Sequence, residues 1–209
     1  MAPTDGNLLE RWRAGDRGSG EVLFDRYYDL VERFFLNKVA SAVQDLVQET
    51  FTRCVEGRDR IRGEFRLYII GIAYNVLKAH LRVRYRDGAA IDVEESAMRD
   101  MEPGPGPATL LVQRREDRLL LEALRNLPIQ EQVILELHYW ENLTTDEIAD
   151  ALELPIGTAR GRLQRARDKL GEVLHRITES PHELTSTLAC LEDWARDCRK
   201  HLDSYRSEK

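Results

Sequence analysis

The chain has 209 residues, with 31 lysines and arginines against 37 aspartates and glutamates and a formal net charge of −6. This length allows one or two domains of roughly 100 residues each, and either domain can bury a core without disulfides or metal. The composition, with 33% charged and 7% aromatic residues, excludes collagen-like, mucin-like and wholly disordered chains.

Three features of the sequence lead us to expect a cytoplasmic protein. The longest apolar stretch without a charge, residues 67–77, is too short to span a bilayer. The first residues lack the basic start and apolar core of a signal peptide. Three cysteines are an odd number and too few for a disulfide framework, so a reducing compartment is the simplest setting.

Apolar side chains recur at three- and four-residue spacings in the first half of the chain. This spacing predicts helices over residues 21–39, 42–55 and 64–86, with a glycine-containing turn at 55–63 between the second and the third. No alternating pattern of useful length predicts a β-strand. We therefore expect an all-α fold made of two small helical domains.

A change in composition predicts the boundary between these domains. Residues 89–110 carry one basic and five acidic side chains and contain the run Pro-Gly-Pro-Gly-Pro at 103–107, which is typical of a flexible linker. The predicted domains are residues 1–88 and 111–177. An amphipathic pattern predicts a further helix in the extension 178–209, which either packs on the second domain or acts as a regulatory element.

The strongest local signal lies in residues 143–170. Thr144 and Glu147 form a T-x-x-E capping box, which starts a short helix. A tight turn at 153–154 follows, and Pro155 suits the first position of a second helix because that position needs no backbone N–H donor. Two short helices joined in this way predict a helix-turn-helix unit.

The second helix of this unit has one apolar and one polar side. Ala159, Leu163, Ala166 and Leu170 fall in one narrow sector that we expect to face inward. On the other side, glutamine and arginine can read base edges in a DNA major groove, and the flanking cations can neutralise phosphates. The alternative is an ordinary solvated helix. The candidate DNA-binding residues are Thr158, Arg160, Gly161, Arg162, Gln164, Arg165, Arg167 and Lys169.

The segment LPIQEQVILELHYWENLTTDEIADALELPIGTARGRLQRARDKL, residues 127–170, resembles the promoter-reading C-terminal domain of bacterial sigma factors of the extracytoplasmic-function group. The first half of the chain agrees with this resemblance. DLVQETF at 45–51 and FRLYIIGIAYNVLKAHLRVRYR at 65–86 stand in the order and spacing of that group's first conserved domain. The resemblance covers about residues 8–87 and 112–175.

In this family the DLVQE segment docks on the clamp helices of RNA polymerase. The resemblance therefore implies that Asp45, Gln48 and Glu49 bind core RNA polymerase. These residues are three and four apart, so they can share one exposed face of a helix. Without the resemblance, the same face is equally well an ordinary surface patch.

The resemblance also implies that the turn 55–63 and the helix after it melt the promoter and capture an unstacked base of the −10 element. Cations along this path can hold a displaced strand. Tyr68 and Tyr74 lie in an apolar run, where core packing is favoured over base stacking, and Asn75 is favoured as a hydrogen-bond partner in the core. The candidate −10 residues are Arg58, Arg60, Arg62, Lys78, Arg82 and Arg84.

The sequence thus predicts an alternative sigma factor that binds core RNA polymerase and promoter DNA, with an anti-sigma protein as the inhibitory partner that the resemblance implies. Two other functions stay open: a polymerase-independent helix-turn-helix regulator, and a sigma-like adaptor for another protein. We expect no cofactor, no metal and no enzymatic activity. The one conceivable metal set has spacings that do not favour zinc; it consists of His182, Cys190, Cys198 and His201.

Overall fold

The computed structural model describes residues 3–36, 38–39, 42–84 and 115–178, together with the single positions 185, 193 and 196. Within these residues every regular element is a helix, which confirms the predicted all-α fold. No helix among them is both long enough and apolar enough to cross a membrane. The predictions for the linker, for the conceivable metal set and for nearly all of the C-terminal extension lie outside the described residues.

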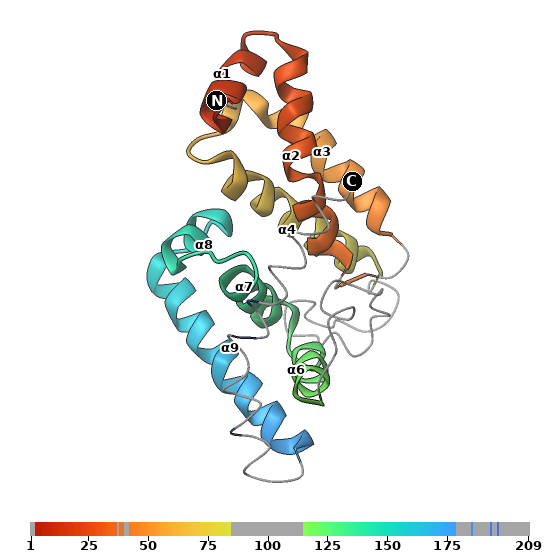
Figure 1. Cartoon of the computed structure of the whole chain (residues 1–209), viewed down its shortest axis with the longest axis vertical. Coiled ribbons are helices and arrows are strands. Elements are labelled where there is room, and N and C mark those ends of the chain that lie inside the picture. Colours follow the sequence, from red (N-terminus) through yellow and green to blue (C-terminus); the bar gives the residue numbers. More distant parts are fainter. Residues whose placement is uncertain are drawn as a thin grey trace.

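The N-terminal domain contains α1 to α4, which run from red to yellow in Figure 1. All three helices predicted for this half of the chain are present, with ends that differ from the prediction by at most four residues. The turn predicted at 55–63 is partly helical, because α3 continues to Gly57 and a short 3₁₀ helix follows. The elements are α1 (Asp5–Arg13), α2 (Arg17–Leu36), α3 (Val43–Gly57), η1 (Arg58–Arg60) and α4 (Phe65–Arg84).

Aromatic side chains hold the N-terminal domain together. Trp12 of α1 packs edge-on against Phe24 of α2 with ring centroids 5.4 Å apart, and Tyr27 packs against Phe65 of α4 at 5.3 Å. Gly20 lies against the Trp12 ring, where an added Cβ would come within 2.6 Å of the indole nitrogen. The small residue in α2 therefore makes room for the indole that fixes α1 in place.

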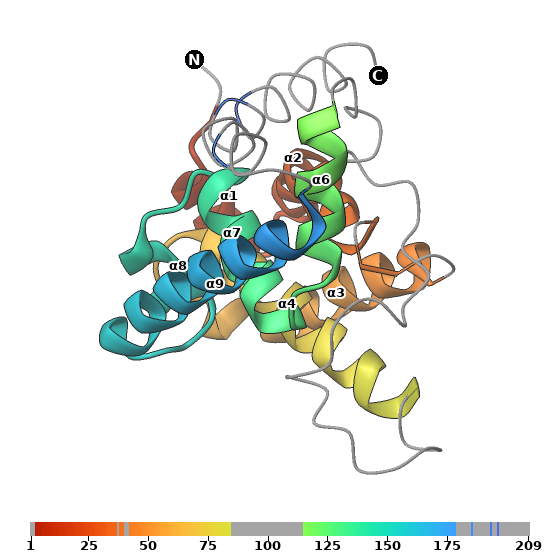
Figure 2. The same ribbon diagram turned by 90° about the horizontal axis from the view of Figure 1, so that it is seen from below.

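The C-terminal domain contains α6 to α9, which run from green to blue in Figure 1; Figure 2 shows α9 crossing beside α7. The pair α8 and α9 forms the predicted helix-turn-helix, and Thr144 and Glu147 make the predicted reciprocal capping box. Pro155 is the N-cap of α9 rather than its first helical residue, one position from the prediction. The elements are α6 (Arg115–Arg125), α7 (Ile129–Tyr139), α8 (Thr145–Ala151) and α9 (Ile156–Ile177).

The inward stripe predicted for α9 is confirmed. Ala159, Leu163, Ala166 and Leu170 are all buried, and α9 packs on α6, α7 and α8. Because these residues recur every three or four positions, their burial fixes the rotation of α9 about its axis. The polar side of the helix must then face away from the core.

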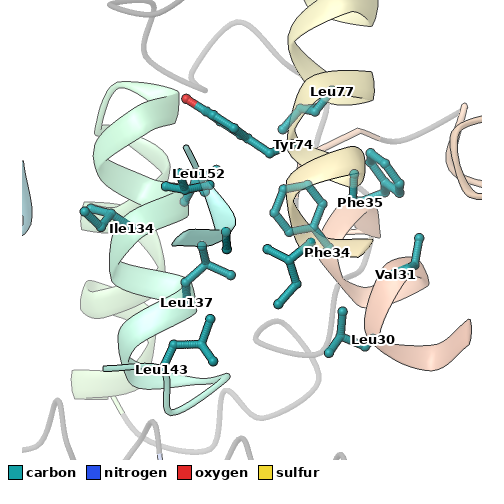
Figure 3. Close-up of a cluster of buried hydrophobic side chains, with 14 of the residues drawn as sticks. Leu30, Val31, Phe34, Phe35, Tyr74, Leu77, Ile134, Leu137, Leu143 and Leu152 are labelled. Atoms are coloured by element: carbon teal, nitrogen blue, oxygen red, sulfur yellow. The ribbon is translucent and has the colours of Figure 1, made fainter. Parts of the chain in front are cut away.

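The two domains pack against each other, chiefly through α4 and α8. Figure 3 shows Phe34 and Tyr74 of the N-terminal domain facing Leu137, Leu143 and Leu152 of the C-terminal domain, and all five side chains are buried. Apolar contact of this kind contributes about 25 cal/mol for each Å² removed from water. The hydrophobic core is therefore continuous from one domain to the other.

A buried ion pair crosses this interface between the domains. Lys38, which is fully buried, lies between the end of α2 and α7. Its Nζ donates to the carbonyl oxygen of Phe34 at 2.8 Å and to the carboxylate of Glu136, and that carboxylate also accepts from the Gln132 amide at 2.8 Å. Desolvation offsets much of the attraction in such a pair, so its main effect is to specify how the domains fit.

Glu141 makes a second charged contact between the domains. Arg66 of α4 donates through Nη2 to the Glu141 carbonyl oxygen at 2.6 Å and to the Glu141 carboxylate at 3.1 Å. The Nη2 atom of Arg33 lies 3.5 Å from the other carboxylate oxygen of Glu141. Arginines from two helices of the N-terminal domain thus hold one glutamate of the C-terminal domain.

Candidate nucleic-acid and polymerase interfaces

The outward side of α9 carries most of the residues predicted to read DNA. Thr158, Arg160, Gln164 and Arg165 are exposed, whereas Gly161 and Arg162 are partly buried.

The capping box at the start of α8 stabilises the helix that packs beside α9. Two hydrogen bonds from Thr144 lower the pKa of the Glu147 carboxyl group; the bond from the side chain has the larger effect and the bond from the backbone N–H the smaller. The carboxylate therefore stays ionised and caps the start of α8.

Local contacts orient two of these exposed side chains. Arg160 Nη2 lies 3.7 Å from a carboxylate oxygen of Asp146, and the Gln164 amide donates to Asp168 at 2.9 Å. Both contacts are exposed to solvent and therefore weak, so DNA can replace them at little cost. The surface thus presents a glutamine, two arginines and a hydroxyl group along about two turns of helix.

Two of the predicted DNA-binding residues are instead held against the body of their own domain. Arg167 Nε donates to the Tyr139 hydroxyl group at 3.1 Å, and Nη2 lies 2.9 Å from Nε2 of His138. Lys169 Nζ donates to the carboxylate of Glu131 at 2.7 Å. These bonds join α9 to α7, so both cations stabilise the position of the reading helix in this structure.

The turn predicted to act at the −10 element is fixed by an arginine that the sequence analysis missed. Arg13 of α1 donates through Nε to the carbonyl oxygen of Arg58 at 3.1 Å and through Nη2 to that of Ile61. Gly57 lies against the hydroxyl group of Tyr68, where an added Cβ would come within 2.2 Å of the phenol oxygen. The backbone of the turn is therefore held by side chains from outside it.

This turn forms one side of a pocket of about 980 Å³. Arg60 and Arg62 are exposed at its edge, and Tyr68 is partly buried within it. Desolvation raises the pKa of the Tyr68 hydroxyl group, so this ring is an uncharged surface at neutral pH. The other wall includes Asp150, Ala151 and Glu153 from the end of α8 and the turn after it. The pocket therefore lies between the two domains.

The interpretation of Asn75 as a core hydrogen-bond partner is wrong. Asn75 is exposed and lines the pocket, because it falls on the opposite side of α4 from the buried residues Ala73, Tyr74 and Leu77. The prediction that Tyr74 packs in the core is confirmed. The prediction failed because the residues around Asn75 in the sequence are apolar, although one side of this helix faces solvent.

The remaining predicted −10 cations follow the second half of α4. Lys78 lies over the Tyr74 ring, with Nζ 4.5 Å from the ring centroid, and Arg82 is exposed. Arg84 is the last residue of the helix, and its side chain lies outside the described part of the structure. The basic half of α4 thus extends from the pocket toward the helix end.

The residues predicted to bind polymerase share one exposed face of α3. Asp45, Gln48 and Glu49 are all exposed, while Leu46 and Val47 between them are buried. The Glu49 carboxylate accepts from Arg53 Nε at 2.7 Å, an exposed contact one helical turn apart. The helical spacing that led to this prediction is therefore present, and the interface between the domains leaves the face uncovered.

Taken together, the geometry defines a two-domain helical protein of the DNA-binding class, with a helix-turn-helix in its second domain. Family models match both domains: sigma-70 region 2 over residues 23–87 and sigma-70 region 4 over residues 117–170. The described residues contain no group of histidine, cysteine, aspartate and glutamate side chains that could hold a metal ion.

Several relatives resemble the chain over most of its length. The ECF RNA polymerase sigma-E factor of Haemophilus influenzae is 28% identical over 179 residues, which cover 80% of this chain and 93% of the relative. The protein of the same name from Escherichia coli K12 is 28% identical over 176 residues, covering 80% and 92%. The chain belongs to the sigma-70 family of RNA polymerase sigma factors, in the extracytoplasmic-function group.

Solved structures share the fold. CnrH, in a complex with the cytosolic domain of CnrY, superposes with a TM-score of 0.58 at 22% identity, covering 83% of this chain and 99% of CnrH. The sigma factor RpoE of Bartonella quintana, in a complex with the anti-sigma factor NepR, gives a TM-score of 0.52 at 19% identity, covering 78% and 99%. The all-helical, two-domain arrangement is thus a known sigma-factor fold.

Proposed function

We propose that this protein is an alternative sigma factor that binds core RNA polymerase in the cytoplasm and directs it to a subset of promoters. One observation carries the proposal: a single chain combines sigma-70 region 2 and region 4, and each domain presents an exposed polar surface where its role requires one. The role is one of binding, and RNA synthesis itself is left to the polymerase. Domain limits of 1–88 and 111–177 are consistent with the matched regions.

The −35 element is read by α9. In this proposal the exposed residues Gln164 and Arg165 contact base edges, because glutamine pairs with adenine and arginine with guanine in the major groove. Thr158, Arg160 and Arg162 lie nearer the start and the edge of the helix, where contacts with phosphates set the register. Gly161 has no side chain, so DNA can approach the backbone of α9 closely on the same side.

The −10 element is melted and held by the N-terminal domain. Arg58, Arg60 and Arg62 surround the turn, and Lys78, Arg82 and Arg84 continue along α4, so a displaced strand meets cations from the pocket to the helix end. Asn75 in the pocket can exchange hydrogen bonds with the edge of an unstacked base. We therefore assign the basic residues on this side of the domain to binding the displaced strand.

Core polymerase is bound by Asp45, Gln48 and Glu49 on α3. Two carboxylates and an amide on one helical face suit a basic partner helix. An inhibitory protein is also expected, since the sigma factor RpoE, which has this fold, was solved in a complex with the anti-sigma factor NepR, and CnrH in one with the cytosolic domain of CnrY. For this chain, an anti-sigma partner is part of the proposal.

Transcription in vitro tests this function. The full chain is mixed with core polymerase and a library of promoter fragments, and the transcripts are sequenced; specific new start sites are expected. Q48K/E49K, which replaces a neutral and a negative side chain by positive ones, should abolish holoenzyme assembly. Glu10→Lys, at another exposed glutamate on α1, should not. Normal assembly by Q48K/E49K would contradict the polymerase-binding role.

The same assay separates the other functions. Duplex binding without polymerase would indicate an independent helix-turn-helix regulator, and partner binding without any transcripts would indicate an adaptor. Arg160→Ala should weaken initiation at all promoters alike, while Gln164→Ala should change which promoters are used. Equal effects of the two substitutions at every promoter would contradict base reading by Gln164.

A further inference from the structure

One histidine connects both helices of the helix-turn-helix. His138, in the last turn of α7, lies with Nδ1 3.0 Å from the carbonyl oxygen of Leu143 and with Nε2 2.9 Å from Nη2 of Arg167. Leu143 immediately precedes Thr144, the N-cap of α8, and Arg167 lies in the middle of α9, which crosses beside α7 in Figure 2. A single imidazole ring therefore bridges the start of α8 and the middle of α9.

The two contacts determine where the proton of this imidazole lies. A carbonyl oxygen can only accept a hydrogen bond, so Nδ1 carries the hydrogen and donates it to Leu143. A guanidinium group can only donate, so Nε2 keeps its lone pair and accepts from Arg167. The bridge therefore requires the neutral ring in its Nδ1–H tautomer.

Protonation of His138 breaks this bridge. A second ring proton occupies the lone pair that accepts from Arg167, and it places two positive charges against each other. The Leu143 carbonyl keeps its donor, so the ring stays at the start of α8 and the contact that is lost is the one to α9. Histidine is the side chain that ordinarily gains a proton between about pH 5 and pH 8.

The surroundings of the ring do not compensate an added charge. From α9 the ring faces Arg167, and within α7 it packs edge-on against Tyr139 with ring centroids 4.9 Å apart. Among the described contacts, no carboxylate bonds to this imidazole. The next three carboxylates in the chain are engaged elsewhere: Glu141 by Arg33 and Arg66, Asp146 by Arg160, and Glu147 by Thr144.

We propose that His138 is a positioning residue for the reading of the −35 element. Its neutral ring sets α9 relative to α8, and its protonation releases Arg167 and weakens the reading. Lys169 of α9 stays bonded to Glu131 of α7, so the domain keeps its fold while α9 is freer to shift. This inference rests on the proposed function, which assigns the −35 element to α9.

Nuclear magnetic resonance tests the tautomer directly in the full chain. The protein is labelled with nitrogen isotope in its histidines, and a two-dimensional spectrum correlates the ring nitrogens with the carbon-bound ring protons at about pH 8. The signals of His138 are assigned by their absence from His138→Phe. We expect the Nδ1–H pattern, and the Nε2–H pattern would overturn the inference.

The effect on promoter reading is measured with holoenzyme formed from core polymerase and the full chain. The template is a promoter identified by the sequenced transcripts, and the comparison template is the same promoter with a scrambled −35 element. The ratio of their transcripts reports −35 reading, because the response of the polymerase itself to pH is common to both. In the wild type this ratio should fall about fivefold between about pH 8 and pH 6, the effect of one lost hydrogen bond.

Three variants separate positioning from packing. His138→Gln has an acceptor for Arg167 and a donor for Leu143 but does not titrate, so its ratio should match the wild type at about pH 8 and stay constant in acid. His138→Phe keeps a ring without either group, so its ratio should be low at both pH values. His175→Gln, at an exposed histidine in the last turn of α9, is the matched control and should follow the wild type.

The outcomes distinguish this inference from the function on which it rests. Equal pH dependence of the wild type and His138→Gln, in chains that initiate at specific promoters, overturns the positioning role alone. A wild-type ratio that rises in acid also overturns it, because released Arg167 then strengthens the DNA contact. If His138→Gln does not fold, the tautomer of the wild-type ring decides. Failure of every form, wild type included, to initiate transcription overturns both.

Discussion

The buried pair between Lys38 and Glu136 makes the closed arrangement of the domains sensitive to a single substitution. Lys38 is fully buried, and Glu136 supplies its only carboxylate partner among the described contacts. Glu136→Gln keeps the shape of the side chain but leaves the ammonium group buried beside a neutral amide. Removing one member of a buried ion pair costs about 3–5 kcal/mol.

This cost falls on the closed state alone, since Lys38 meets water once the domains separate. A loss of about 3 kcal/mol changes the ratio of closed to open chain by roughly 150-fold. The loss in overall stability cannot exceed the free energy of opening, because the chain escapes the cost by opening. Glu136→Gln should therefore expand the chain while each domain keeps its own fold.

A double substitution provides the control. K38M/E136M replaces both charges by apolar side chains of similar length, a change that is often neutral or stabilising at buried pairs. The double variant should be closed again, although Glu136→Gln alone is open. The assay is small-angle scattering together with hydrogen exchange of α4 and α8. A Glu136→Gln chain as compact as the wild type, or a double variant as open as Glu136→Gln, would refute the reasoning.

Three further predictions concern single positions. Thr144→Ala should lower the free energy of unfolding by about 1 kcal/mol. Because the fold lowers the pKa of Glu147, the stability that this carboxylate contributes is present above the ordinary glutamate pKa and is lost as the pH falls. The melting temperature of Thr144→Ala should therefore depend less on pH in the acid range than that of the wild type. Burial raises the pKa of the Cys54 thiol to about 12, so Cys54 should react with a thiol reagent at pH ~8 only after denaturation, as measured in a variant whose other two cysteines are serine; fast labelling of the native protein would contradict this burial. Arg13→Ala should release the Arg58 carbonyl and loosen the turn, which would reduce promoter melting, followed by permanganate footprinting, while polymerase binding stays as it was; a parallel loss of both would point to a general folding defect instead.

The sequence by itself determined the local structure of both domains. The capping box at Thr144, the inward stripe of α9 and the shared face of Asp45 and Gln48 were all predictable, because each depends on residues within about three turns of one helix. The division into two helical domains followed in the same way from periodicity and from the composition of the linker. The family resemblance supplied the roles that spacing alone left open.

The tertiary structure decided which polar residues are available and how the domains meet. Arg167 and Lys169 lie at the edges of the polar side of α9 and bond to α7, and no pattern within α9 identifies these partners. Lys38 and Glu136 are 98 positions apart and resemble ordinary surface residues until the two domains bury them together. Periodicity reports only which face of a helix is apolar, whereas a contact between distant segments depends on the shapes and charges of both, and these come together only in the folded chain.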